Sequence, residues 1–462
     1  MLAHLTSDQG DAVPITPVTR DGFAAWLAVA AEAERNWLRA TDFAAEPGKV
    51  GLLPGPGGRL ARVLVGVAPD DFLWSLAALP DTLPEGRYAL DVAPGAAGWD
   101  AAGTTRATLG WALGTYAFTR YKSRPRPFAT LVWPARADRA EVERLASGIF
   151  LARDLINTPA EDMGPAALAA AATSLAEREG ARCTVIVGDA LLAANYPTVH
   201  AVGRASVRPP CLIDLRWGDE AAPKVTLVGK GVCFDSGGLD LKPASGMKLM
   251  KKDMGGAAIL LGLASAIMDA RLPIRLRVLV PAVENAVSAN AFRPLDVITT
   301  RSGKTVEIGN TDAEGRLILC DALAEADSEK PDLIVDAATL TGAARVALGP
   351  DLPALYCNDD GLADALLRSG IAEADPLWRM PLWQPYRKLL DSKVADLSNV
   401  AESPFAGSVI AALYLAEFVA PTTPWAHLDV MAWNGSARPG RPEGGEAMSL
   451  RALYAHLKKR FG

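Results

Sequence analysis

The sequence predicts a two-domain α/β fold, with a smaller N-terminal α/β domain and a larger second domain in which helices cover both faces of a mixed β-sheet. Three observations predict it. The chain has 462 residues, more than one ordinary domain holds. Half of its residues are hydrophobic and 22% are charged, a balance typical of globular proteins with large cores. Beyond residue 138, strand-like and helix-like segments alternate, as in a sheet covered on both faces.

A connecting helix is expected between the two domains. Residues 1–137 would form the N-terminal domain, in which no chemical motif is recognisable. Apolar residues then recur at helical spacing, and Pro159 ends the pattern, so 138–158 is predicted to be helical. Residues 159–462 would form the second domain.

Elements of the second domain are predicted from their apolar patterns. Strands are expected at 225–228, 274–283, 333–337 and 425–430. Helices are expected at 255–270, 317–326, 407–419 and 447–461. In such sheets, chemistry collects in the loops at the carboxyl ends of the strands.

Composition argues against several classes of partner. With 47 Lys and Arg against 53 Asp and Glu, the net charge is −6, so a broad basic face for nucleic acid is not expected. The N-terminus lacks a basic run leading into an apolar segment, and no apolar stretch is long enough to span a bilayer. We therefore expect a cytoplasmic protein that uses neither membrane nor nucleic acid.

Cysteine and histidine are too sparse for several common metal sites. The five cysteines are widely spaced without a CxxC pair, and the four histidines form no HExxH motif. Neither a disulfide framework nor a thiolate zinc site is expected. Any bound metal would depend mainly on oxygen ligands.

Two segments place charged residues directly beside apolar elements. In the first, Lys230 and Asp235 follow the strand at 225–228 amid glycines, which let the backbone approach a bound group. Lys242 and Asp253 come shortly afterwards. Taken singly, such residues are usually helix caps or exposed surface groups.

The second segment is NTDAEGR at 310–316. Asp312, Glu314 and Arg316 would project to one side of an extended chain, whereas on a helix they would diverge. Glu314 by itself could simply complement a helix dipole. Together with the first segment, however, it brings four carboxylates beside apolar elements, which is costly if they converge without partners.

Two divalent cations would resolve that cost. Asp235, Asp253, Asp312 and Glu314 carry four negative charges, and oxygen ligands suit manganese or magnesium as well as zinc. An ion pair about 3.5–4 Å apart can hold a hydroxide and polarise a carbonyl or phosphoryl oxygen. The residues alone thus predict a binuclear hydrolase. A two-metal phosphoesterase stays an alternative, although it should show further basic residues or a helix N-terminus aimed at phosphate.

Both segments resemble the leucyl aminopeptidase family of cytosolic metallopeptidases (cytosol aminopeptidases). The motifs GKGVCFDSGG, KKDMGGAA and NTDAEGR occur in the family's order and spacing, and NTDAEGR is very specific. The resemblance runs from Arg153 to the C-terminus, through RDLINTPAEDMGP, ATLTGA, PLWRMPLW and WAHLD. It implies that 159–462 is a catalytic domain that removes N-terminal residues from peptides with a free amine.

The resemblance also implies two zinc or manganese ions per chain. The implied ligands of the tightly bound ion are Lys230, Asp235, Asp253 and Glu314. Those of the exchangeable ion are Asp235, Asp312, through its side chain and backbone carbonyl, and Glu314. Asp235 and Glu314 would then bridge the ions.

The implied mechanism is attack on the first peptide carbonyl by a hydroxide held between the two ions. Lys242 would polarise that carbonyl and stabilise the tetrahedral intermediate. Arg316, with the backbone around Leu340, would hold a bicarbonate ion that acts as general base.

The implied pocket for the first side chain favours apolar residues and includes Met250, Thr339, Leu340 and Gly342. Two departures from the family pattern lie near the site. Glu446-Ala447 replaces a threonine-glycine turn, and Leu239-Asp240 replaces the commoner Ile-Ser pair. Neither touches the implied ligands, so they bear on substrate preference rather than on activity.

A homohexamer is implied as well, and two tryptophans between 376 and 385 are compatible with it, although they could equally belong to a core. A hexameric scaffold or nucleic-acid-binding relative with little activity remains an alternative, which the acidic balance disfavours.

Overall fold

The computed structural model describes residues 2–92 and 96–462. The chain divides into two compact units, Met1–Ala146 with Ser436–Glu443 and Ser147–Gly435 with Gly444–Gly462. The predicted α/β fold, with a smaller N-terminal part and a larger part built on a mixed sheet, is confirmed. Helix α6 (Arg139–Asn157) occupies the segment expected to connect the domains. Nothing in the sequence predicted that residues 436–443 belong to the first unit.

The first unit contains a six-stranded sheet in the order β1-β6-β5-β2-β4-β3, parallel except for the β3–β4 pair. Its strands are β1 (Leu5–Thr6), β2 (Val13–Val18), β3 (Val50–Pro54), β4 (Leu60–Gly66), β5 (Arg87–Leu90) and β6 (Thr130–Val132). Its helices are α1 (Phe23–Val29), α2 (Glu32–Ala40), η1 (Pro56–Gly58), α3 (Phe72–Ser75), α4 (Leu79–Thr82) and α5 (Ala101–Gly114).

The second unit is built on a nine-stranded sheet in the order β16-β15-β18-β14-β9-β11-β8-β7, with β10 beside β11. Its centre is parallel, and the pairs β15–β18, β11–β8 and β7–β8 are antiparallel. The strands are β7 (Arg182–Val187), β8 (Cys211–Trp217), β9 (Lys224–Gly229), β10 (Gly231–Asp235), β11 (Arg275–Asn285), β14 (Leu333–Ala338), β15 (Ala354–Cys357), β16 (Trp378–Arg379) and β18 (Trp425–Asp429). Two small sheets comprise β12 (Val297–Thr299), β13 (Thr305–Glu307) and β17 (Leu397–Ser398), and β19 (Trp433–Asn434) and β20 (Gly444–Gly445).

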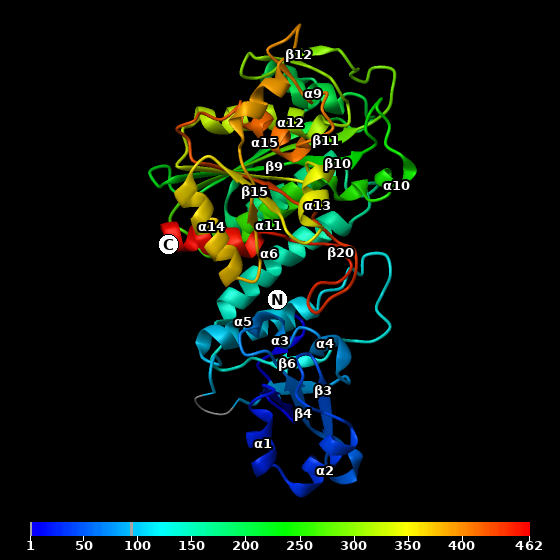
Figure 1. Cartoon of the computed structure of the whole chain (residues 1–462), viewed down its shortest axis with the longest axis vertical. Coiled ribbons are helices and arrows are strands. Elements are labelled where there is room, and N and C mark those ends of the chain that lie inside the picture. The colour runs from blue at the N-terminus through cyan, green and yellow to red at the C-terminus, as the bar shows by residue number, and fades with distance from the viewer. Residues whose placement is uncertain (1, 93–95) are drawn as a thin grey trace. The chain divides into compact units, whose positions relative to one another are not determined.

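Helices lie on both faces of this sheet. Figure 1 shows α12 and α15 on one side and α11 and α14 on the other. Helix α11 is apolar all round and buried from Gly255 to Met268, as expected for a helix enclosed by other elements. The helices are α7 (Pro165–Glu179), α8 (Ala190–Ala193), α9 (Pro197–Gly203), α10 (Ala244–Met247), η2 (Met250–Met254), α11 (Gly255–Asp269), α12 (Glu314–Ser328), α13 (Gly342–Leu348), α14 (Asp360–Ala372), η3 (Gln384–Leu390), α15 (Gly407–Ala416) and α16 (Leu450–Phe461).

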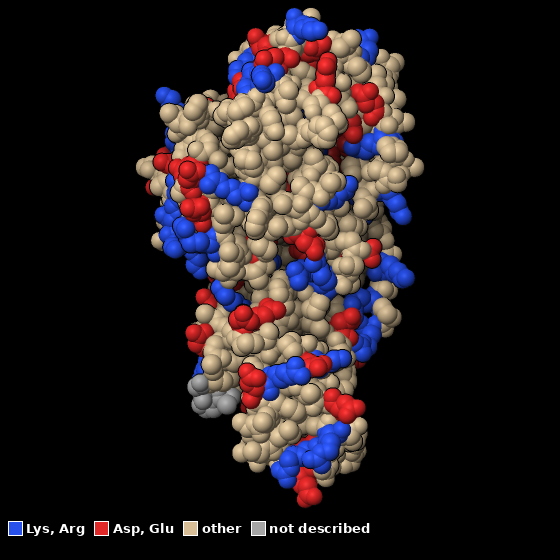
Figure 2. Space-filling view, in the orientation of Figure 1, with Lys and Arg blue, Asp and Glu red and all other residues tan. Residues whose placement is uncertain are grey.

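The surface is mixed in charge on the face shown in Figure 2, where acidic and basic side chains are interspersed among wide uncharged areas. Among the described residues, the structure contains no helix whose apolar length would let it cross a bilayer.

Two glycines let α11 come into direct backbone contact with the sheet. A Cβ atom on Gly256 would lie 1.9 Å from the carbonyl oxygen of Ala337 on β14. A Cβ atom on Gly229, the last residue of β9, would lie 2.5 Å from the Cα atom of Ala257. The first turn of α11 is therefore held against the carboxyl ends of β9 and β14, where no side chain fits between them.

We expect G256A to lower the free energy of unfolding by about 1–3 kcal/mol. The new methyl group would overlap a backbone atom of β14, so β14 would have to move. Denaturant titration monitored by circular dichroism measures this change. The matched control is G246A on the exposed helix α10, where the nearest atom to a new Cβ lies at an ordinary 3.6 Å. Equal stability of the two variants would show that the close packing of α11 is dispensable.

Candidate metal centre

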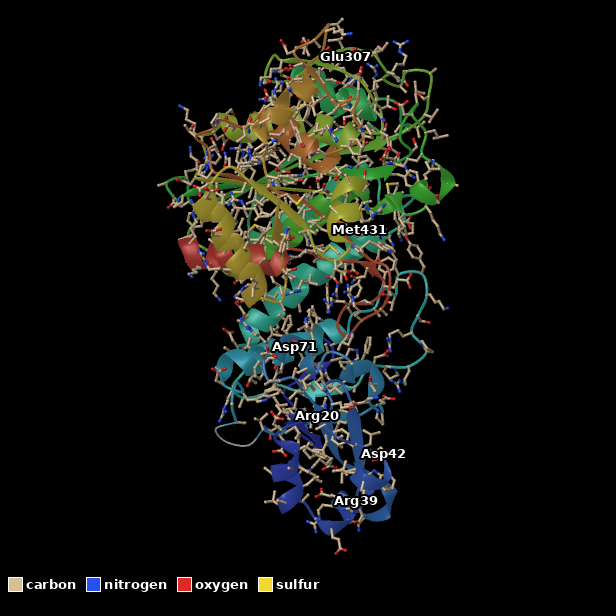
Figure 3. The ribbon with its side chains drawn as sticks, viewed as in Figure 1. Arg20, Arg39, Asp42, Asp71, Glu307 and Met431 are labelled. Carbon is tan, nitrogen blue, oxygen red and sulfur yellow. The ribbon has the colours of Figure 1, made fainter. Side chains whose placement is uncertain are left out.

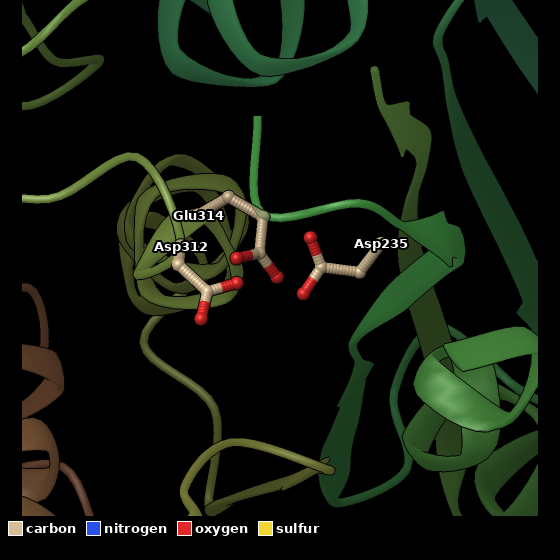
Figure 4. A group of neighbouring side chains, drawn as sticks. All are labelled: Asp235, Asp312 and Glu314. Atoms are coloured by element: carbon tan, nitrogen blue, oxygen red, sulfur yellow. The ribbon is translucent and has the colours of Figure 1, made fainter. Parts of the chain in front are cut away.

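Three carboxylates converge at the carboxyl edge of the large sheet. Asp235 is the last residue of β10, Asp312 lies in the turn before α12, and Glu314 is the first residue of α12. Each offers an oxygen, and these oxygens all lie within 4.8 Å of one another (Figure 4). Asp235 and Glu314 are buried, and the side chain of Asp312 is 34% exposed. Helix α12 begins at Glu314, so Arg316 does not project to the same side as Asp312 and Glu314. The extended conformation considered for residues 312–316 is therefore wrong.

Asn285 links two of these segments, although no sequence motif marked it as a candidate. Its side-chain amide donates to Asp235 Oδ1 at 2.9 Å and to the backbone oxygen of Thr311 at 3.1 Å. Asn285 ends β11, the parallel neighbour of β10. The contact therefore joins the end of the sheet to the turn that carries Asp312.

The loop after β10 is fixed by glycines and by Asp240. Gly237 and Gly238 have φ values of +88° and +66°, the left-handed region that glycine favours. The Asp240 carboxylate accepts the backbone N–H of Thr311 at 2.7 Å, and the Thr311 hydroxyl accepts the N–H of Asp240 at 2.8 Å. Asp240 thus caps the turn that precedes Asp312.

Two lysines join the carboxylates into one cluster. Lys230 is buried, and its Nζ lies 2.7 Å from Asp253 Oδ2 and 3.0 Å from Glu314 Oε1. Lys242 Nζ lies 2.8 Å from Asp235 Oδ2 and 2.5 Å from Asp312 Oδ1. All six predicted residues of this charge cluster are therefore brought together by the fold.

Asp253 belongs to this cluster and is not a helix cap. It lies in η2, whereas the residue that caps α11 is Met254. Its Oδ1 atom accepts the hydroxyl hydrogen of Thr339 at 2.7 Å, which leaves Oδ2 facing Lys230.

Burial makes the charged forms of these carboxyl groups energetically unfavourable. Burial, followed by repulsion from Asp235, raises the pKa of Glu314 to about 8 and that of Asp312 to about 6. Burial by itself would lower the pKa of Lys230, but the carboxylates of Asp253 and Glu314 outweigh it and raise the pKa.

The donor set fits divalent cations. Glu314 Oε2 is buried and has no hydrogen-bonding partner among the described residues. Buried carboxylates that repel one another gain most from a doubly charged ion, and carboxylate oxygens are hard ligands of the kind that manganese and magnesium prefer and that zinc also accepts. Lys230 fits as a ligand only if it loses its proton, which an adjacent cation favours.

A cavity of about 350 Å³ opens beside the cluster. The predicted pocket residues Met250, Thr339, Leu340 and Gly342 line it, as do the cluster residues Lys230, Asp235, Lys242, Asp253 and Asp312. Four further residues of the wall were not candidates from the sequence, namely Lys252, Arg345, Asp429 and Met431. Met431 is labelled in Figure 3.

Asp429, at the end of β18, organises the wall of the cavity. Its Oδ1 atom accepts the backbone N–H groups of Leu340 and Thr341 at 3.0 and 3.1 Å, and its Oδ2 atom accepts the Thr341 hydroxyl at 2.6 Å. The loop that carries Thr339, Leu340 and Gly342 is therefore held in place by a buried carboxylate. The motif WAHLD contained this residue, but only the fold shows what it binds.

Arg316 lies apart from the cavity wall. It is buried, its Nη1 atom donates to the backbone oxygen of Asn399 at 2.6 Å, and its Nε atom has no hydrogen-bonding partner among the described residues. It is not among the residues that line the cavity. Burial lowers the pKa of its guanidinium.

Lys252 is a cation of the cavity wall that the sequence analysis did not predict. Its side chain is buried, and burial lowers its pKa to about 8. The sequence showed it only as the neighbour of Asp253 in the KKDMGG motif.

Comparisons with known proteins identify related chains. Residues 150–454 match the catalytic domain of the cytosol aminopeptidase family, and residues 13–134 match the M17 aminopeptidase N-terminal domain. The resemblance drawn from the motifs is confirmed, and it extends into the first unit, where no motif was recognisable.

Individual relatives are similar over most of their length. A probable cytosol aminopeptidase from Geobacter sp. (strain M21) is 42% identical over 77% of this chain and 76% of its own. The crystal structure of a cytosol aminopeptidase from Coxiella burnetii is 49% identical, covers 99% of both chains and superposes with a TM-score of 0.95. The bottromycin maturation enzyme BotP in complex with Mn is 35% identical, over 97% of this chain and 99% of its own, with a TM-score of 0.88.

We expect E314Q to stabilise the metal-free protein while weakening its binding of Mn²⁺. The folded-state pKa of about 8 lies above the ordinary 4.5, so folded protein binds more protons than unfolded protein between these values. Stability of the unsubstituted metal-free protein should therefore fall as pH rises from about 4.5 to 8. The variant should show a flatter profile and at pH 8 gain at least about 1 kcal/mol.

Denaturant titration across pH in the presence of chelator, with and without added Mn²⁺, measures both effects. The control is E402Q, which changes an exposed glutamate. A metal-free E314Q protein that is less stable than the parent at pH 8 would contradict this electrostatic account.

Proposed function

The chain belongs to the cytosol aminopeptidase family of metallo-exopeptidases, and from this membership we propose that it is a leucyl-type aminopeptidase that works with two divalent metal ions. It would remove the first residue from peptides that carry a free N-terminal amine. The observation that carries the proposal is the convergence of four carboxylates and Lys230 from separate elements, with a cavity beside them.

The proposed ligands divide into two overlapping sets. Lys230, Asp235, Asp253 and Glu314 would hold the tightly bound ion, and Asp235, Asp312 and Glu314 the exchangeable one. The contacts of Lys230 with Asp253 and Glu314 support the first set, and the grouping of three carboxylates within 4.8 Å supports the second. The ions would be zinc or manganese, and the relative BotP has been solved in complex with Mn.

When bound, such an ion pair supplies a water nucleophile that is deprotonated near neutral pH and polarises the scissile carbonyl. Lys242 would complete the electrophilic side of the site. Its Nζ atom lines the cavity between Asp235 and Asp312, and although burial opposes it, the Asp235 carboxylate raises the pKa of this ammonium, which therefore stays charged. A fixed ammonium there can donate to the carbonyl oxygen as negative charge develops on it.

Arg316 is proposed to hold a bicarbonate ion together with the backbone around Leu340, and the bicarbonate would supply a general base. The free Nε atom of this buried guanidinium supports the assignment, because it offers one N–H donor to an anion.

A preference for apolar first residues is proposed from the wall of the cavity. Met250, Leu249, Val430 and Met431 contribute its apolar part, while Thr339 and Gly342 leave space beside them. Such a wall binds an aliphatic side chain by removing its surface from water.

A homohexamer and a cytoplasmic location are proposed as well. Relatives of this chain are named cytosol aminopeptidases, which supports the location. Trp378 and Trp383 are exposed on the single chain, and large exposed side chains of this kind support an interface with further copies.

The proposed activity is tested with chromogenic leucine anilide after loading the protein with Mn²⁺ or Zn²⁺. We expect release of the chromophore from the free-amine substrate, none from its N-acetyl derivative, and two metal ions per active chain by elemental analysis. Hydrolysis of p-nitrophenyl phosphate in place of the anilide would show a phosphoesterase instead. Full activity without bound metal would overturn the two-ion proposal.

The role of Lys242 is tested by K242M, which removes the ammonium and keeps most of the aliphatic stem. We expect kcat for leucine anilide to fall by about 10²–10³-fold while both metal ions remain bound, because the variant loses a donor to the developing negative charge. The control is K248M, which changes an exposed lysine outside the cavity wall. Unchanged kcat in K242M would remove Lys242 from the mechanism.

A further inference from the structure

One cation in the wall of the cavity has no role in the mechanism described above. Lys252 lies in η2, lines the cavity and is only 5% exposed. Among the described residues, its ammonium makes neither a hydrogen bond nor an ion pair with any side chain. Because the side chain is largely buried and lines the cavity, a group bound in the cavity is what can give this ammonium a partner.

The acidic groups near Lys252 are already engaged. Asp253, its chain neighbour, contacts Lys230 and accepts the hydroxyl of Thr339. Asp429 accepts two backbone N–H groups of the 340–341 segment and the hydroxyl of Thr341. The structure therefore offers Lys252 no free carboxylate.

Arg345 places a second positive charge on the same cavity. It lies on α13 and lines the cavity, and its Nη1 atom contacts the sulfur of Met431 at 3.8 Å. Its Nη2 atom lies 4.0 Å from the position of a Cβ atom built on Gly342. No carboxylate of the described residues lies within ion-pair distance of this guanidinium, although Arg345 is exposed to solvent.

Apolar groups line the same cavity. Met250 stands two residues before Lys252, and Met431 contacts Arg345. The cavity thus combines thioether side chains, which suit aliphatic carbons, with two unpaired cations, which suit an anion. A short aliphatic chain that ends in a carboxylate has this distribution of properties.

We propose that the cavity accepts peptides whose first residue is glutamate, with the carboxylate bound by Lys252 and Arg345 and the methylene groups packed against Met250 and Met431. Lys252 would be a specificity-determining residue. The inference rests on the proposed function, because it takes the first side chain to enter this cavity. It adds an acidic substrate to the apolar ones, and it excludes lysine and arginine as first residues through repulsion between like charges.

Glutamate and glutamine provide the sharpest comparison, since their side chains have nearly the same size and differ in charge. For the metal-loaded enzyme we expect kcat/KM for glutamate anilide to exceed that for glutamine anilide by at least tenfold. In K252M this ratio should fall to near one, and K252R should restore most of it. R345Q should lower the ratio by about threefold, because an exposed charge contributes less than a buried one.

Lys248 supplies the matched control, since K248M removes a nearby exposed positive charge that does not line the cavity and should leave the ratio unchanged. If K252M does not fold, R345Q and competition by free glutamate against free glutamine in the unsubstituted enzyme decide the question. Hydrolysis of leucine anilide without any preference for glutamate over glutamine would overturn the acidic pocket and leave the proposed function intact. Failure to hydrolyse any of the three anilides would overturn both.

Discussion

Repulsion among buried carboxylates is the constraint on which the rest of this structure depends. Asp235, Asp253, Asp312 and Glu314 lie in one cluster beside the cavity, and three of them are almost fully buried. Such a group is tolerable only with compensating positive charge, which Lys230 and Lys242 supply through four short contacts. The pKa of Glu314 remains raised despite these lysines, so the cluster still favours additional cations.

The fold holds this unfavourable group together with contacts made elsewhere. Most of the charged residues lie at the ends of strands or in the turns and helical segments beside them, and those elements are packed by features that involve no charge. The backbone contact of Gly256 with β14 is of this kind, and so is the hydrogen bond from Asn285 to the backbone oxygen of Thr311. Stability of the apolar core thus offsets strain at the site, as is common where a site must bind a strongly charged group.

Much of the second unit follows from its sequence. The apolar runs at 225–228 and 333–337 form β9 and β14, because they have the composition of buried strands, and the segment 255–270 forms α11, because its apolar pattern is long. The charged motifs were also visible, since acids and lysines directly after buried strands are unusual. The strands of the first unit were not predicted, because they lie among glycines and prolines that weaken periodic patterns.

By itself, the sequence determined the class of fold, the chemistry of the charged motifs and the family resemblance, because these depend on residue types at short spacing. Only the tertiary structure decided which side chains meet. Asn285 joins Asp235 to the backbone of Thr311, which lies 26 residues after Asn285 in the chain. Asp429 binds the backbone of a loop that lies almost 90 residues before it. Lys252 is an ordinary lysine in the sequence and a buried cation in the cavity, because burial and partners depend on strands and helices that pack across long separations.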